Sequence, residues 1–351
     1  MAATLHDVAL LAKVSIKTVS NVVNGYPYIK DSTKTRVLEA IAALGYQPNL
    51  TARGLRLGRT GVIGLAVPEL RLSYFAELAD AVIRAADRHG IGVQIEQTNG
   101  DRDRELALIT SARRQLTDGL IFSPLGLGNE DAALLAVGYP LVLLGERIFD
   151  APADHVTMRN VEAAAAATRR LLAAGRTRIA VIGAHEGEVY GSAALRIRGY
   201  RDALQEAGLP VDAALIRHSD MWHRANGATT VRGLLETGVP FDAVFGLNDT
   251  LALGAIRALQ AAGVRVPEDV SVVGFDNLDE SEYSHPSLST IDAGRDEIAD
   301  TAVRLLLERI AETGPKAPTR RVEADFRLVE RESIGPDRNA HHPHNRQDQP
   351  A

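Results

Sequence analysis

From Val62 onward the chain alternates short apolar runs with amphipathic stretches, and this alternation restricts the fold more than any other feature of the sequence. The apolar runs predict buried strands, and the stretches between them predict helices because their apolar residues recur at helical spacing. The elements expected first are 62–67, 75–89, 92–97, 102–116, 119–123 and 141–144. The rhythm then restarts, with elements expected at 161–174, 178–182, 196–207, 243–247, 250–262, 271–275, 296–313 and 319–327. This pattern predicts an α/β fold of two doubly wound lobes with parallel sheets, and a cleft where the strand ends meet.

The first 45 residues follow a different pattern, which predicts three short helices. Thr4 can cap the first helix, with Asp7 completing a capping box, and Ser15 can cap a second helix that runs to about Asn24. The third is expected at 31–44, closed by Gly45. The residues expected to face inward on the second and third helices are Val19, Val22, Val23, Val37, Leu38, Ile41 and Leu44. This small unit has a thin core.

The charge is distributed unevenly along the chain. Residues 1–59 carry eight lysines and arginines against three acids, a net charge of +5, which leaves −11 for the remainder of a chain whose total is −6. A basic N-terminal region on an acidic body indicates that only this region meets a polyanion. Residues 48–60, basic and punctuated by glycine, read as a linker with one short helix possible at 49–57.

Several classes of protein are excluded or disfavoured by what the sequence lacks. Cysteine is absent, which excludes disulfides, thiolate metal sites and cysteine nucleophiles and fits a reducing compartment, so a cytoplasmic protein is expected. No secretory signal is visible, and no apolar run approaches the roughly 18 residues that span a bilayer, so no membrane association is expected. No Gly-x-Gly-x-x-Gly or Gly-x-Ser-x-Gly motif stands in its proper context, and no enzyme activity, cofactor or metal site is expected.

One face of the predicted second helix has the composition of a DNA-reading surface. Its residues are Ile16, Lys17, Ser20, Asn21 and Asn24. In the major groove, Lys17 can reach guanine O6 and N7, Asn21 or Asn24 can pair with adenine, and Ile16 can contact a thymine methyl. The alternative is an ordinary solvated helix face. The basic N-terminal region, the helix-turn-helix spacing and the linker that follows favour DNA binding.

Four motifs carry a family resemblance. They are Thr4-Leu5-x-Asp7-Val8-Ala9, Val14-Ser15-x-x-Thr18-Val19-Ser20-x-Val22-x-Asn24-Gly25, Leu44-Gly45-Tyr46-x-Pro48-Asn49 and Gly61-x-Ile63-Gly64. Together they resemble the lactose repressor/galactose repressor family of bacterial transcription regulators, from Thr4 to about Ser333. The resemblance implies a homodimer whose helix-turn-helix domains read a palindromic operator in double-stranded DNA. It also implies a periplasmic-binding-protein-like core that binds a small effector, commonly a sugar or nucleoside derivative.

The resemblance also assigns DNA-binding residues by position. In the helix-turn-helix they are Thr4, Ser15, Ile16, Lys17, Thr18, Ser20, Asn21, Asn24 and Tyr28, and in the linker Asn49, Ala52, Arg53, Leu55 and Arg56. Leu55 matches a hinge-helix leucine that wedges into the minor groove, although a linker leucine packed on its neighbours is the ordinary alternative. Lys13 departs from the family, because many relatives place glycine there. Asn21 departs as well, since arginine is common at that position, so the usual operator preferences do not transfer.

A second set of residues matches effector-binding positions. It consists of Ser73, Tyr74, Phe75, Ser123, Arg147, Arg196, Trp222, Asn248 and Asp276. Each has an ordinary alternative: Arg196 as a surface ion pair, Trp222 as a core aromatic, and Asn248 as a helix cap. Arg159 stands where relatives typically carry aspartate before Asn160. It signals either an anionic effector such as a sugar phosphate or a surface exchange, and the second interpretation is preferred.

The expected domains are a helix-turn-helix domain at 1–47, a hinge at 48–60, a two-lobed effector-binding and dimerisation core at 61–334, and a disordered tail at 335–351. Lobe 1 is expected at about 61–160 and 290–320, and lobe 2 at about 161–289 and 321–334. The competing class is a periplasmic sugar-binding protein with the same core fold. That class needs a signal peptide and does not need residues 1–60, so the sequence favours a DNA-binding repressor.

Overall fold

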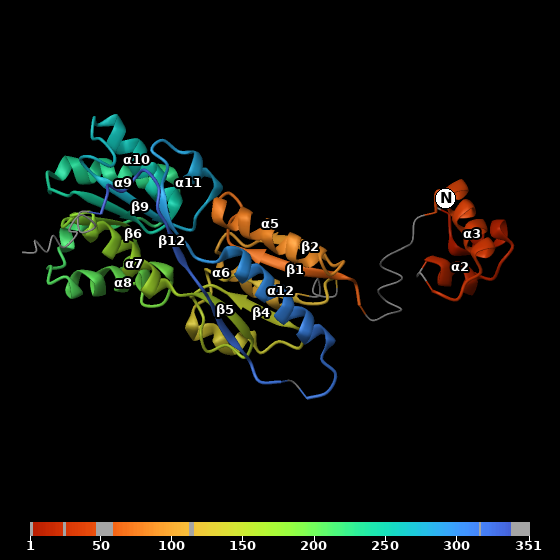
Figure 1. Ribbon diagram of the computed structural model, residues 1–351. Helices are drawn as coiled ribbons and strands as arrows, with labels where there is room; N and C mark the ends of the chain where they lie inside the picture. Colours follow the sequence, from red (N-terminus) through yellow and green to blue (C-terminus); the bar gives the residue numbers. More distant parts are fainter. Residues whose placement is uncertain (1–2, 24–25, 47–58, 112–115, 316, 338–351) are drawn as a thin grey trace, which may run out of the picture. The chain divides into compact units, whose positions relative to one another are not determined.

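The computed structural model describes residues 3–23, 26–46, 59–111, 116–315 and 317–337 (Figure 1). The chain divides into two compact units, Met1–Gly61 and Val62–Ala351, here called the head and the core. Each is described by itself. No helix in these described ranges is both long and apolar enough to cross a membrane.

The described part of the head contains three helices, α1 (Leu5–Ala12), α2 (Ile16–Val23) and α3 (Asp31–Leu44). The predicted capping box of α1 is confirmed: Thr4 Oγ1 accepts the Asp7 N–H at 3.3 Å, and Asp7 Oδ2 accepts the Thr4 N–H at 2.8 Å. Ser15 Oγ accepts the Thr18 N–H at 3.1 Å, which caps α2 as expected. Lys13 follows α1 with φ of 53°, a left-handed conformation that favours glycine.

The hydrophobic interior of the head is small. Val8, Val19, Val22, Val37 and Ala40 are buried, with Val23 and Ile41 packed against them. The prediction that Leu38 and Leu44 face inward is wrong, because their side chains are 49% and 37% exposed. Of the residues of α3, only Val37 and Ala40 are buried, so three short helices cover one side of it.

The core contains two sheets that, over the described residues, have six strands each. In the first the order is β11-β5-β4-β3-β1-β2, and in the second it is β12-β10-β9-β8-β6-β7. All neighbours pair in parallel except β10 and β12. The first sheet consists of β1 (Val62–Val67), β2 (Gly92–Gln97), β3 (Leu120–Phe122), β4 (Leu141–Leu144), β5 (Asp154–Met158) and β11 (Arg321–Ala324). The second consists of β6 (Ile179–Ala184), β7 (Ile216–His218), β8 (Ala243–Gly246), β9 (Ser271–Phe275), β10 (Ser289–Asp292) and β12 (Arg327–Val329).

Helices cover both faces of each sheet, as the alternating pattern predicted. The first lobe has α5 (Ser73–Asp87) and α12 (Arg295–Ala311) on one face, and α6 (Arg102–Thr110) and the 3₁₀ helix η2 (Asn129–Leu135) on the other. The second lobe has α7 (Asn160–Ala173) and α8 (Ser192–Glu206) opposite α9 (Arg224–Thr237) and α10 (Asp249–Ala261), an arrangement visible in Figure 1. The second lobe also contains two short elements, the 3₁₀ helix η3 (Ala213–Leu215) and α11 (Asp279–Tyr283).

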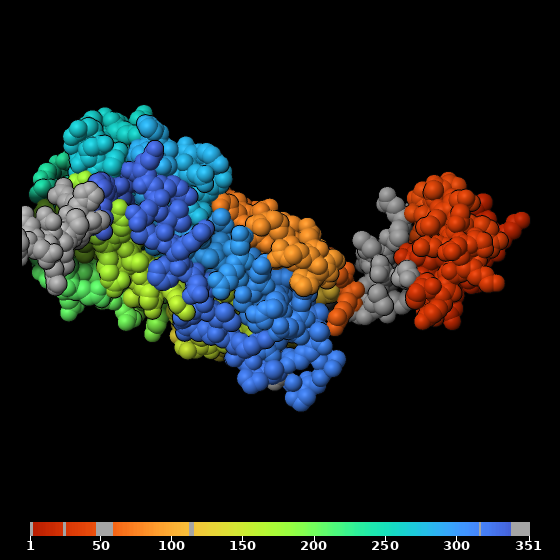
Figure 2. All heavy atoms as spheres, viewed as in Figure 1, coloured from red at the N-terminus to blue at the C-terminus, as the bar shows by residue number. Residues whose placement is uncertain are grey.

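The described chain passes between the lobes three times: after β5, after β10 and between β11 and β12. Because β10 ends at Asp292 and β11 at Ala324, the second and third crossings lie a few residues after the boundaries expected at about 290 and 321. β10 pairs with β9 in the second sheet, and β11 pairs with β5 in the first. The single strand expected at 319–327 is in fact two strands, because a chain that continues from one sheet to another keeps its extended pattern. Figure 2 shows this C-terminal part, in blue, running over both lobes.

Candidate functional site

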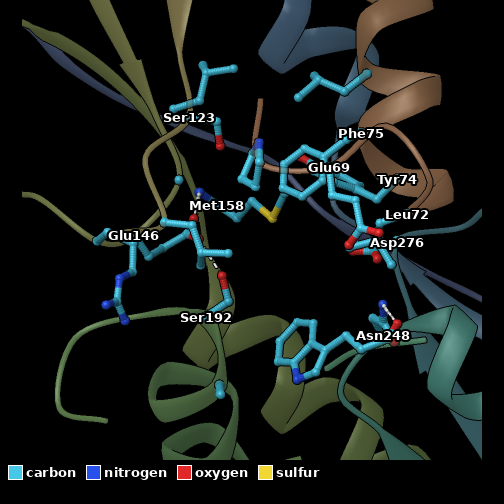
Figure 3. Close-up of a pocket in the computed structure, with 18 of the residues that line it drawn as sticks. Glu69, Leu72, Tyr74, Phe75, Ser123, Glu146, Met158, Ser192, Asn248 and Asp276 are labelled. Carbon is cyan, nitrogen blue, oxygen red and sulfur yellow. Dashed lines mark hydrogen bonds between the residues drawn. The ribbon is translucent and has the colours of Figure 1, made fainter. Parts of the chain in front are cut away.

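A cleft of about 190 Å³ lies between the lobes of the core. Part of its polar lining comes from residues that follow the carboxyl ends of strands: Glu69 after β1, Ser123 after β3, Glu146 after β4, His185 after β6, Asn248 after β8 and Asp276 after β9. Parallel strands in both lobes bring these ends to the same place. Figure 3 shows Ser123 and Tyr74 on one side of the cavity, with Ser192 and Asn248 on the other.

Arg196 on α8 is 3% exposed and is held from several sides. Its Nε donates to Asn160 Oδ1 at 2.8 Å, and its Nη1 donates to the Leu247 carbonyl. The guanidinium lies 3.5 Å from the centroid of the Phe275 ring. Burial lowers the pKa of Arg196, while the neighbouring Asp276 favours its charged form. The alternative interpretation of Arg196 as a surface ion pair does not describe this residue, since the side chain is buried in the cleft wall.

Asp276 has an unusual backbone and an unusual environment. Its φ is 121° and that of Asn277 is 51°, both in the region that favours glycine, and Arg295 Nη1 donates to the Asp276 carbonyl at 3.1 Å. In the described part of the chain no group donates a hydrogen bond to its carboxylate, and Arg196 Nη1 lies 3.8 Å away. Burial raises the pKa of Asp276 to about 8. A strained residue with a spare acceptor beside a cavity is typical of a ligand contact.

Trp222, the single tryptophan of the chain, lines the second-lobe side of the cleft. Its Nε1 donates to the Gly183 carbonyl at 2.9 Å, and the His185 ring lies 5.5 Å away. Asn248 Oδ1 accepts the Leu251 N–H at 2.9 Å and so caps α10, while Asn248 Nδ2 donates to the Trp222 carbonyl at 3.2 Å. Asn248 is therefore both the helix cap and part of the cleft lining.

The cleft lining contains charged residues that the sequence did not single out. Glu146 accepts hydrogen bonds from Ser192 Oγ at 2.6 Å, Thr157 Oγ1 at 2.9 Å and the Met158 N–H at 3.2 Å. The bond to Ser192 joins the two lobes. A signal for Glu146 was present, because it directly follows a buried apolar run, where a parallel sheet places its ligand-binding residues.

Two further lining residues, His185 and Glu188, were not singled out from the sequence, and the His185 ring lies beside Trp222. Glu188 Oε2 is 2.5 Å from His185 Nδ1 and 3.6 Å from the Arg147 guanidinium. Burial opposes the ionisation of Glu188, but the hydrogen bonds from His185 and the Ala194 N–H and the nearby charge of Arg147 together outweigh it and hold the pKa of this carboxyl below its usual value. Because the carboxylate can only accept, His185 carries a proton on Nδ1.

The structure gathers most of the predicted effector residues in this cleft. Those that line it are Tyr74, Phe75, Ser123, Arg147, Arg196, Trp222, Asn248 and Asp276. Ser73 lies outside the lining and contacts Glu280 at 3.4 Å and Arg224 at 3.3 Å. Arg159 also lies outside it and pairs with Asp325 at 3.0 Å, so its positive charge serves an ion pair between two of the lobe crossings.

In the head, α2 presents a candidate DNA-reading face opposite its buried valines. Val19 and Val22 are buried, Ile16 is 47% exposed, and Lys17 is exposed. Ser20 and Asn21 are half-buried on the same helix, and Tyr28 is 84% exposed beside Tyr26. Asn24, Asn49, Ala52, Arg53, Leu55 and Arg56 lie outside the described residues.

Comparison with known proteins assigns both parts of the chain. Residues 4–49 match the family described as bacterial regulatory proteins, lacI family, and residues 168–334 match the periplasmic binding protein-like domain. The catabolite control protein A of Priestia megaterium is 34% identical over 87% of this chain and 92% of its own length. The ribose operon repressor of Haemophilus influenzae is 32% identical over 95% of this chain and 98% of its own.

Solved structures agree with the sequence comparisons. A LacI-family transcriptional regulator from Sanguibacter keddieii, 50% identical, covers 79% of this chain and 100% of its own with a TM-score of 0.74. The lac repressor dimer bound to operator and the anti-inducer ONPF is 27% identical, covers 96% of this chain and 100% of its own, and has a TM-score of 0.82. The chain therefore belongs to the lacI family of bacterial regulatory proteins.

Proposed function

We propose that this protein is a cytoplasmic transcriptional repressor that binds a palindromic operator as a homodimer and responds to a sugar or sugar derivative in the interlobe cleft. The observation that carries the proposal is the presence, in one chain, of an exposed polar face on α2 and a ligand-sized cleft lined from two lobes. The ribose operon repressor and a cellobiose-bound regulator among its similar proteins support a sugar as the effector.

The head supplies the DNA contacts in this proposal. Lys17 and Ile16 are exposed on α2, where a recognition helix meets base edges. The buried valines fix α2 against α1 and α3, so the exposed face is held rigidly. The hinge residues, with Leu55 as a minor-groove wedge, remain a prediction from the sequence.

In this proposal the core controls DNA binding through the effector that it holds. Several hydrogen bonds and ion pairs link the lobes around the cleft, among them Glu146 with Ser192 at 2.6 Å, Glu69 with His223 at 3.2 Å, and Glu77 with the Asp279 N–H at 3.2 Å. Because the lining comes from both lobes, a ligand binds the closed and open arrangements unequally. That inequality is what couples an effector to DNA binding.

The competing function, a sugar-binding protein without DNA binding, leaves the head without a role. The family match at residues 4–49 favours the regulator. No observation favours catalysis, and the proposal treats the protein as a binding protein.

Selection of operator sequences from a random duplex library tests the proposal. The full chain is expected to retain a palindrome, and Lys17→Ala is expected to relax the preference at one base position in each half-site by about 1–3 kcal/mol. Lys34→Ala, an exposed lysine on α3, is the matched control that removes the same charge and keeps the base preference. Retention of DNA without any sequence preference would refute the assignment.

A further inference from the structure

The charges that line the cleft have an excess of acid. The lining carboxylates are Glu69, Glu146, Glu188, Asp220 and Asp276, and the lining guanidinium groups are Arg147 and Arg196. Burial raises the pKa of Asp276 to about 8, so this carboxyl is left out of the charge count, and the other four carboxylates still outnumber the two guanidinium groups by two. A negative cleft repels an anion and is indifferent to an uncharged ligand.

The two cleft arginines already have acidic partners. The Arg147 guanidinium lies 3.6 Å from Glu188 and donates to the Tyr190 carbonyl at 3.2 Å. Arg196 is committed to a side-chain amide, a main-chain carbonyl and Asp276. An arriving phosphate would have to compete with these carboxylates for the arginines.

The histidines of the lining are paired in the same way. His185 Nδ1 is 2.5 Å from Glu188, and His223 Nε2 is 3.2 Å from Glu69. Every basic side chain that lines the cleft in the described part of the chain therefore lies against a carboxylate. Among the described lining residues, Arg147 Nε and His185 Nε2 are buried without a hydrogen-bond partner, but both side chains lie against Glu188, so a phosphate that reached them would meet that carboxylate.

The acidic side also favours a ligand rich in hydroxyl groups. Asp276 is 5% exposed, lies against the cavity and accepts no hydrogen bond from the described residues. Glu146 is 4% exposed, and the donors that bond it within the described ranges are all neutral. Hydroxyl groups donate to carboxylates, whereas a phosphate dianion only accepts and adds to the repulsion.

Resting on the proposed function, we infer that the effector is an uncharged polyhydroxyl compound, a sugar without a phosphate or carboxylate group, and that the acidic lining rejects the phosphorylated forms of the same sugar. Arg159, the residue that suggested an anionic effector, is engaged with Asp325 outside the cleft. It therefore does not offset the acidic lining.

Fluorescence of the single tryptophan tests the inference, because Trp222 lines the cleft. The full chain is titrated with ribose, glucose, galactose and cellobiose, and in parallel with ribose 5-phosphate, glucose 6-phosphate and inorganic phosphate. At least one uncharged sugar is expected to bind, with at least a tenfold lower Kd than its own phosphate ester. Equal or tighter binding of a phosphate ester overturns the inference, and so does a panel in which no uncharged sugar binds.

Charge-removing variants test the cause of the discrimination. Glu146→Gln and Asp220→Asn each remove one negative charge from the lining, and Asp220 is exposed, so its replacement does not endanger folding. Both are expected to narrow the ratio between the Kd values of the phosphate ester and the sugar by severalfold. Glu206→Gln is the matched control, since Glu206 pairs with Arg169 at 2.8 Å on the surface, and it should leave the ratio unchanged.

An unchanged ratio in both cleft variants contradicts the electrostatic cause. The operator selection described above is independent of these titrations. A chain that selects a palindrome but binds no uncharged sugar refutes the ligand class alone, whereas a chain that binds sugar without selecting DNA refutes the regulator assignment.

Discussion

Replacing Arg196 by alanine tests the structural account of the cleft most severely. The change leaves Asp276 buried without its cation and removes the donors to Asn160 and to the Leu247 carbonyl. Breaking a buried ion pair from one side costs about 3–5 kcal/mol of stability. Burial already favours the protonated form of Asp276, which limits the penalty, so we expect a loss of about 3 kcal/mol near neutral pH.

A double variant separates the charge from the lost contacts. In Arg196→Ala with Asp276→Asn the uncompensated charge is gone, and we expect about 1–2 kcal/mol of the loss to be recovered, a coupling typical of residues in direct contact. The matched control is Arg198→Ala on the same helix, because its guanidinium is 69% exposed and lies 3.9 Å from Asp202. Exposed pairs of this kind contribute about 0–1 kcal/mol.

Urea denaturation of the full chain, followed by far-ultraviolet circular dichroism, measures these differences. A loss of about 3 kcal/mol shifts the midpoint of the core transition by about 1 M urea at a slope of about 3 kcal/mol per molar, the upper end of the usual range, since the slope rises with protein size. A loss below about 1 kcal/mol in Arg196→Ala, with no recovery in the double variant, would refute the reasoning.

Three further predictions concern the caps and the cleft. Thr4→Ala removes one half of the α1 capping box and should destabilise the head by about 1 kcal/mol, measured by calorimetry, with no change in the core transition. Lys13→Gly relieves a left-handed residue and should stabilise the head by about 1 kcal/mol; destabilisation would contradict the strain argument. The pKa of Asp276 is raised by burial from 3.8 to about 8, so between these values the folded state holds a proton that the unfolded state releases. Stability of the wild-type core should therefore fall as pH rises from about 5 to 8 relative to Asp276→Asn, and parallel denaturation profiles would contradict the shift.

The local features of the fold could be predicted from the sequence because they depend on neighbours a few residues apart. The capping box of Thr4 and the cap at Ser15 are of this kind. The alternation of apolar runs and helices likewise predicted two parallel sheets. The strand that divides into β11 and β12 could not be separated, since its extended pattern is continuous and only long-range pairing assigns each half to a sheet.

The residues of the candidate site could also be predicted only in part. Arg196, Trp222, Asn248 and Asp276 were named from a family resemblance, and the structure brings them to one cleft. Glu146 was missed because its importance arises from partners distant in the chain, among them Ser192. The sequence also could not show whether the Arg159 side chain faces the cleft, because its ion-pair partner Asp325 lies far along the chain, on another lobe crossing.

The most direct test of the central claim is reciprocal linkage between the cleft and the operator. The affinity of the full chain for its selected operator is measured with and without a saturating uncharged sugar, and the affinity for the sugar is measured by Trp222 fluorescence with and without operator. The account predicts that both affinities change by the same factor, about 5–150-fold for typical couplings. Sugar binding at Trp222 that leaves operator affinity unchanged would contradict the account.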